Sequence, residues 1–146
     1  MGGIDEPQVS TLCHEFGFRT LSDRLCSLSA KDAPQEWKTD YRLVASCEQL
    51  DALVEDLSKQ KQISIDTETT STNPRWAEIV GYSFSWQEGM GVYVAVRSPP
   101  GEPSIDPQYA RDALRPILED PSIKKIGQNL KYDIVVLRND GTFMQG

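Results

Sequence analysis

The sequence of 146 residues contains no long apolar run, only three cysteines and a single histidine. Apolar stretches of a few residues exclude a membrane-spanning helix, and no basic segment leading into an apolar core marks a signal peptide. Cys13, Cys26 and Cys47 are odd in number and irregularly spaced. They therefore argue for reduced thiols in a cytoplasmic protein and against a disulfide framework.

The sequence also has fewer basic than acidic residues. Lys and Arg number 15 against 22 Asp and Glu, which leaves a net charge of −7. Domains that hold nucleic acid by bulk electrostatics usually present a basic face, so this balance argues against such a domain. It does not exclude an enzyme that recruits cations to offset its own carboxylates and the phosphates of a substrate.

The pattern of the chain changes at residue 41. Residues 1–40 combine a short helical segment with a linker over residues 29–40, and they are predicted to form an N-terminal arm. From residue 41 the order of predicted elements is β-α-β-β-β-α-β-α, which indicates an α/β domain with a mixed sheet and flanking helices over residues 41–146. The predicted strands are 41–46, 62–68, 77–86, 91–96 and 123–127, and the predicted helices are 47–60, 107–118 and 128–140.

Two acids stand at the end of the strand in "QISIDTETTST", residues 62–72. Side chains two apart on a strand share a face, so Asp66 and Glu68 present their carboxylates together at the carboxyl end, where α/β sheets bind ligands. Such a pair repels unless a cation or a proton intervenes, and hard oxygen ligands favour Mg²⁺ or Mn²⁺. The alternative is an acidic strand end that faces water.

A second polar cluster follows in "GQNLKYD", residues 127–133. Asn129 and Asp133 are four residues apart, which predicts that they lie on one helix face. Asp133 would then lie at the edge of a buried face, where it can approach the first two acids. The alternative is a surface residue paired with Lys or Arg.

The stretches "IDTETTSTNPRWAEIVGYSFSW" and "LEDPSIKKIGQNLKYD", with the spacing between them, closely resemble the 3′–5′ proofreading exonuclease domain of bacterial DNA polymerase I. That domain belongs to the DEDD exonuclease family and has a ribonuclease H-like fold. The resemblance covers residues 41–146. Residues 1–40 are more weakly similar to the join that follows a 5′-nuclease domain.

The resemblance implies a role for each matching residue. Asp66, Glu68 and Asp133 would hold two divalent cations, Mg²⁺ or Mn²⁺, with Glu68 orienting the attacking water. Thr69, Asn129 and Tyr132 would contact the terminal nucleotides of a single-stranded or frayed 3′ end of DNA. The rest of the polymerase chain would be the remaining partner, and no membrane is expected.

The family has a third motif, a Tyr followed four residues later by an acid, and no such string follows Asp133. The resemblance therefore implies a fold that is C-terminally incomplete and a fragment that hydrolyses DNA very slowly. Two alternatives stay open: a fragment of a ribonuclease D-like exoribonuclease, and a catalytically inert scaffold with the same fold.

Overall fold

The computed structural model describes residues 6–18, 20–21 and 39–146. By contacts the chain divides into two units, Met1–Trp37 and Lys38–Gly146. In the first unit, helix α1 spans Glu6–Glu15. It ends at Gly17, whose φ of +73° lets Phe18 N–H reach the carbonyl of Cys13, the bond that closes a Schellman motif. Except for residues 39 and 40, the predicted linker at 29–40 lies outside the described residues.

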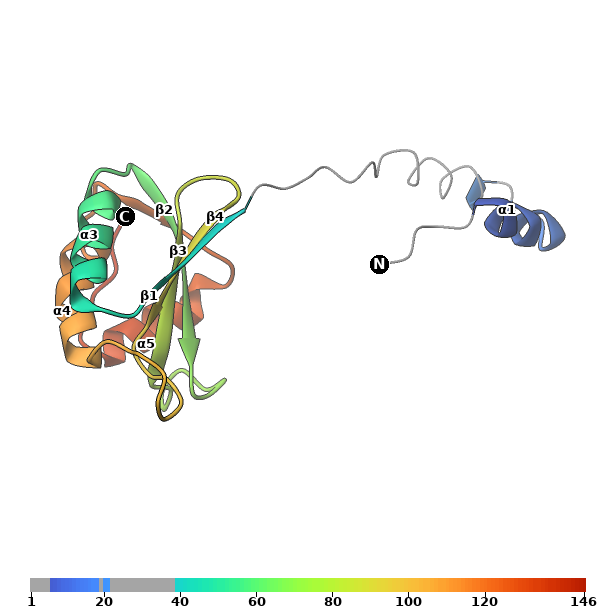
Figure 1. Cartoon of the computed structure of the whole chain (residues 1–146). Helices are drawn as coiled ribbons and strands as arrows, with labels where there is room; N and C mark the ends of the chain where they lie inside the picture. The colour runs from blue at the N-terminus through green and yellow to red at the C-terminus, as the bar shows by residue number, and fades with distance from the viewer. Residues whose placement is uncertain (1–5, 19, 22–38) are drawn as a thin grey trace. The chain divides into compact units, whose positions relative to one another are not determined.

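The second unit is a five-stranded mixed sheet with helices packed against it (Figure 1). The strands lie in the order β1-β4-β3-β2-β5, in which β1 is parallel to β4, β5 is parallel to β2, and the central pairs are antiparallel. The predicted order of elements from residue 41 is confirmed. The elements are β1 (Asp40–Val44), α3 (Cys47–Ser58), β2 (Gln62–Thr69), β3 (Ile79–Ser85), β4 (Met90–Ala95), α4 (Pro107–Leu118), β5 (Lys124–Ile126) and α5 (Leu130–Asn139).

Helices α3 and α4 begin where their sequences place a capping residue. The Ser46 hydroxyl accepts a hydrogen bond from Gln49 N–H at 3.3 Å, and the Asp106 carboxylate accepts one from Tyr109 N–H at 2.9 Å. Both helices turn an apolar stripe inward and lie on one side of the sheet (Figure 1). No helix in the described ranges has the length and hydropathy needed to cross a bilayer.

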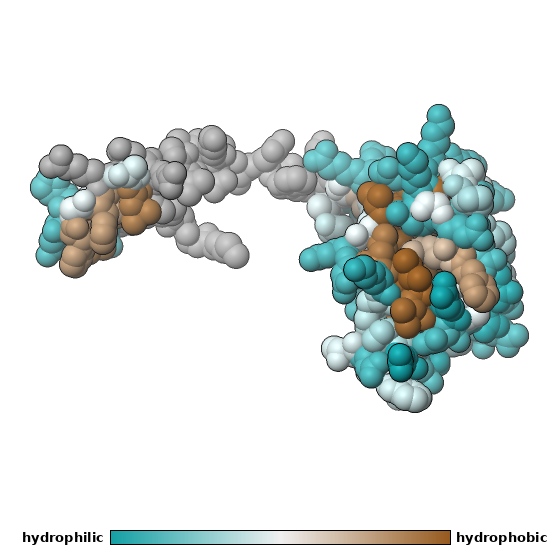
Figure 2. Space-filling model, turned by 180° about the vertical axis from the view of Figure 1, so that it is seen from behind, coloured by the Kyte–Doolittle hydropathy of each residue, from teal (hydrophilic) through white to brown (hydrophobic). Residues whose placement is uncertain are grey.

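The two faces of β2 differ in chemistry. Ile63, Ile65 and Thr67 point into the core formed with the helices, whereas the alternate residues Asp66 and Glu68 are exposed. The surface of this unit is largely polar in the view from behind, with an apolar patch among the polar side chains (Figure 2). Because the side-chain period of a strand is two, the acids are directed to the face opposite the core.

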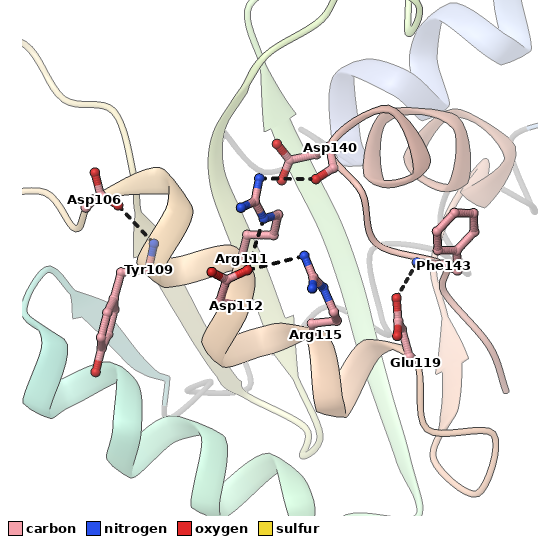
Figure 3. A network of polar contacts seen from close by, with 8 residues as sticks. All are labelled: Asp106, Tyr109, Arg111, Asp112, Arg115, Glu119, Asp140 and Phe143. Atoms are coloured by element: carbon pink, nitrogen blue, oxygen red, sulfur yellow. Dashed lines mark hydrogen bonds and ion pairs between the residues drawn. The ribbon is translucent and has the colours of Figure 1, made fainter.

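Helix α5 is held at its carboxyl end by α4 (Figure 3). Arg111 donates from Nη1 to the carbonyl of Asp140 at 3.4 Å, and Asp112 bridges Arg111 and Arg115 at 3.2 Å each. The Glu119 carboxylate accepts a hydrogen bond from Phe143 N–H at 2.8 Å. The contacts of Arg111 and Glu119 therefore tie the carboxyl end of α5 and the residues after it to α4.

Candidate active site

Asp66 and Glu68 form an unpaired carboxylate pair on the exposed face of β2. The strand register sets Asp66 opposite Ser83 and Glu68 opposite Gly81 on β3. Neither carboxylate has a hydrogen bond or an ion pair among the residues that the structure describes. Two like charges on neighbouring positions of one face repel each other, and a cation relieves that repulsion. Both carboxylates are therefore available as ligands.

Asp133 is buried, with 2% of its surface exposed. Its Oδ1 accepts hydrogen bonds from the backbone N–H of Thr67 at 3.0 Å and from the Thr67 hydroxyl at 2.6 Å. The alternative of a surface residue paired with Lys or Arg is therefore wrong. Its second oxygen, Oδ2, accepts no hydrogen bond. Among the described residues, Nε of Arg115 is the only polar side-chain atom that is fully buried and has no hydrogen-bond partner. Oδ2 is therefore unpaired and not completely shielded from solvent.

The strand edge explains how Asp133 reaches Thr67. Strand β5 pairs with β2 only as far as Ser64, so the edge of β2 beyond that residue has no neighbouring strand. Asp133 binds there and approaches from the side on which the Thr67 side chain lies, whereas Asp66 and Glu68 point to the other face. Accordingly, no three His, Cys, Asp or Glu side chains in the described part of the chain are close enough to hold a metal ion together.

A cleft of about 500 Å³ opens at the carboxyl end of β2. Its lining comprises Thr67, Glu68, Thr69, Thr70, Ser71, Thr72, Asn129 and Tyr132. The Tyr132 hydroxyl donates a short hydrogen bond to the carbonyl of Ser71 and shares another with the Thr69 hydroxyl. Tyr132 therefore ties α5 to the segment that follows β2 and fixes one wall of the cleft.

Asn129 does not lie on a helix face with Asp133, and this part of the prediction is wrong. It occupies the N-cap position of α5 with φ of +57° and ψ of +38°, and its side chain makes no capping hydrogen bond. Asn is one of the few residues that adopt the left-handed conformation at modest cost. The bend turns the exposed Asn129 side chain into the lining of the cleft, beside Tyr132.

Three further residues shape the site and were missed from the sequence. Thr67 anchors Asp133, and the backbone of Ser71 anchors Tyr132. Tyr93 on β4 lines a second hollow of about 330 Å³ together with Asp66 and Ser83. Burial raises the pKa of the Tyr93 phenol, and the negative charge of Glu68 raises that pKa further. The alternation of β2 points to Thr67 as a buried polar residue, but no local pattern identifies its partner.

Comparison with known proteins shows the family to which the chain belongs. A family model for 3′–5′ exonuclease matches residues 41–146. The chain belongs to the 3′–5′ exonuclease family of DNA polymerase I. The chain is 40% identical over 150 residues to DNA polymerase I of Pseudomonas aeruginosa, and the match covers 94% of the chain and 16% of that protein. It is 38% identical over 101 residues to DNA polymerase I of Borreliella burgdorferi, and this match covers 69% of the chain and 11% of that protein.

Solved structures show the same fold at lower identity. The structure of Trypanosoma brucei RNase D in complex with GMP aligns with a TM-score of 0.64 at 20% identity. The alignment covers 75% of this chain and 33% of the RNase D chain. The catalytic core of RRP6 from the same organism aligns with a TM-score of 0.57 at 18% identity, and the alignment covers 75% of this chain and 28% of the RRP6 chain. The predicted ribonuclease H-like mixed sheet is confirmed. The chain spans about a sixth or less of the length of the two polymerases.

Replacing Tyr132 with phenylalanine is expected to loosen the cleft wall. The variant loses the hydrogen bonds to Ser71 and Thr69, so the free energy of unfolding should fall by about 1 kcal/mol. Urea denaturation followed by circular dichroism measures this change. Tyr109→Phe is the matched control, because it removes one exposed hydroxyl bonded to Asp51 at 2.9 Å. Equal losses in both variants would contradict a special role for the Tyr132 hydroxyl.

Proposed function

We propose that this domain hydrolyses the 3′-terminal phosphodiester bond of single-stranded or frayed DNA, as the proofreading part of a larger DNA polymerase I chain. The observation that carries the proposal is the unpaired pair Asp66 and Glu68 beside a cleft lined by Thr69, Asn129 and Tyr132. A frayed single strand offers a flexible terminal nucleotide that such a cleft can surround, whereas a duplex end does not.

The donor set fits Mg²⁺ or Mn²⁺. These ions prefer carboxylate oxygens, and Mg²⁺ is usually bound by one or two carboxylates plus waters and substrate phosphates. Asp66 and Glu68 would supply the two protein ligands. Asp133, anchored through Oδ1 at the edge of β2 and not on the face of the acid pair, would serve a second ion only through water at its unpaired Oδ2. Two bound cations would stabilise both the attacking and the leaving oxygen of the reaction.

The chain's own side chains would orient the attacking water and the terminal nucleotide. Glu68 belongs to the acid pair and also lines the cleft. Its carboxylate would orient the attacking water toward the terminal phosphate. Asn129 and Tyr132 would position the last nucleotide, the Asn by hydrogen bonding and the Tyr by contact with its ring. Thr69 would approach the 3′ end from the strand.

Removal of the charge at Asp66 provides the test. The wild-type chain is expected to bind Mn²⁺ at a saturable site, and Asp66→Asn should weaken that binding at least tenfold, because one of two protein ligands is lost. Electron paramagnetic resonance of free Mn²⁺ measures the affinity. The same samples report binding of a fluorescent oligodeoxynucleotide with a free 3′ hydroxyl, which should be tighter with Mn²⁺ and tighter than binding of the matching RNA.

Glu88→Gln is the matched control, because Glu88 is exposed in the turn between β3 and β4. Its Mn²⁺ affinity should equal that of the wild type. Mn²⁺ binding that survives in Asp66→Asn would favour an inert scaffold over the exonuclease. Preference for the RNA oligonucleotide would favour a ribonuclease D-like activity.

A further inference from the structure

Tyr93 lies in the cross-strand row that contains Asp66. Asp66 on β2 is opposite Ser83 on β3, and Ser83 is opposite Tyr93 on β4. Residues directly opposite one another on antiparallel strands point to the same face. Tyr93 therefore stands on the face that bears the acid pair, two strands away from Asp66.

Gly81 allows the Tyr93 ring to lie across the sheet toward Glu68. A Cβ atom added to Gly81 would stand 2.2 Å from Tyr93 Oη and 2.3 Å from its Cζ, so the hydroxyl end of the ring occupies the space that a side chain would fill. Gly81 is itself the residue opposite Glu68. Opposite Cβ positions in a sheet are about 5 Å apart, which brings the phenol hydroxyl within reach of the Glu68 side chain.

The chemistry of the two groups is complementary. The hydroxyl of a tyrosine is a hydrogen-bond donor, and an ionised carboxylate is an acceptor. Glu68 is exposed and makes no hydrogen bond among the described residues, so its carboxylate is free to turn toward a donor. A hydrogen bond from a neutral phenol would fix its orientation without neutralising its charge.

We propose that Tyr93 is a positioning residue for the acid pair: when the Glu68 side chain turns toward Gly81, the Tyr93 hydroxyl above that glycine would donate a hydrogen bond to its carboxylate and orient it for a divalent cation. This inference rests on the proposed function, in which Glu68 is a cation ligand. Outer partners that orient metal ligands contribute strongly to metal affinity, and their loss typically weakens binding 10- to 100-fold.

The test is the Mn²⁺ affinity of the full chain in matched variants. Tyr93→Phe keeps the ring over Gly81 and removes only the donor, and it should weaken Mn²⁺ binding about tenfold. Gly81→Ala should weaken it similarly by displacing the ring. Tyr109→Phe is the control, because it removes an exposed hydroxyl on α4 that is bonded to Asp51, and it should bind like the wild type.

A double-mutant cycle separates positioning from packing. If Tyr93 acts through Glu68, then Tyr93→Phe should cause no further loss of Mn²⁺ affinity in a Glu68→Gln background, whereas a general effect on the fold would persist there. Wild-type affinity in Tyr93→Phe, with Asp66-dependent binding intact, would overturn this inference and leave the proposed function standing. Absence of Asp66-dependent Mn²⁺ binding in the wild type would overturn both.

Discussion

Replacing Asp133 with alanine is expected to lower the free energy of unfolding by about 3 kcal/mol. The variant removes the acceptor of two hydrogen bonds, from the backbone N–H and the hydroxyl of Thr67, in a single step. Thr67 is 7% exposed, so water cannot readily replace the lost partner and its donors stay unsatisfied. Urea denaturation in the absence of divalent cations measures the effect on folding alone.

Two variants calibrate that loss. Asp133→Asn keeps an acceptor oxygen near Thr67 and should lose about 1 kcal/mol, while Thr67→Val removes only the hydroxyl bond. Asp51→Ala is the surface control, since Asp51 is exposed and accepts one hydrogen bond from Tyr109. A loss in Asp133→Ala no greater than in Asp51→Ala would show that the contact with Thr67 contributes little to folding.

The contact between Asp133 and Thr67 links stability to the proposed chemistry. It holds the amino end of α5 at the edge of β2 through Thr67, the residue between the two acids, and it uses one carboxylate oxygen while the other accepts no hydrogen bond. Asp133→Asn would preserve much of the contact with Thr67 but remove the negative charge. Comparing the two substitutions at this position therefore distinguishes a residue that only holds the fold from one that also serves a cation.

Local signals in the sequence were sufficient for most of the fold. Ser46 and Asp106 begin α3 and α4 as their side-chain chemistry predicts, and the alternation along β2 correctly assigns Asp66 and Glu68 to one exposed face. These features depend on residues within a few positions of each other. Short-range hydrogen bonding and side-chain period decide them, and both can be read along the chain.

The remaining features of the site depend on distant partners. Asp133 and Thr67 are 66 residues apart, and the place of Tyr93 depends on the order of strands across the sheet and on the bare backbone of Gly81. Asn129 was predicted to lie within a helix because its spacing to Asp133 is helical, but the chain bends at Asn129 before α5 starts. Periodicity alone cannot reveal such a bend, because tertiary contacts decide where the first turn begins.

Gly127, two residues before this bend, lies directly against β2, and its replacement by alanine is expected to cost about 2 kcal/mol of folding free energy. A Cβ at this position would stand 2.5 Å from the backbone carbonyl oxygen of Ile65 and 2.7 Å from Cδ2 of Leu130. The carbonyl belongs to β2 and cannot rotate away without disturbing the strand that carries Asp66. The connection between β5 and α5 must therefore shift, and Asn129 shifts with it.

Two measurements on Gly127→Ala follow from this close approach. Urea denaturation should show the loss of stability, and binding of the 3′-hydroxyl oligodeoxynucleotide should weaken severalfold because Asn129 lines the cleft. Gln128→Ala is the matched control, since it alters the adjacent exposed position without adding an atom against β2. If Gly127→Ala matched that control in both measurements, α5 would have to tolerate displacement from β2, and the fixed cleft on which the proposed function depends would not exist.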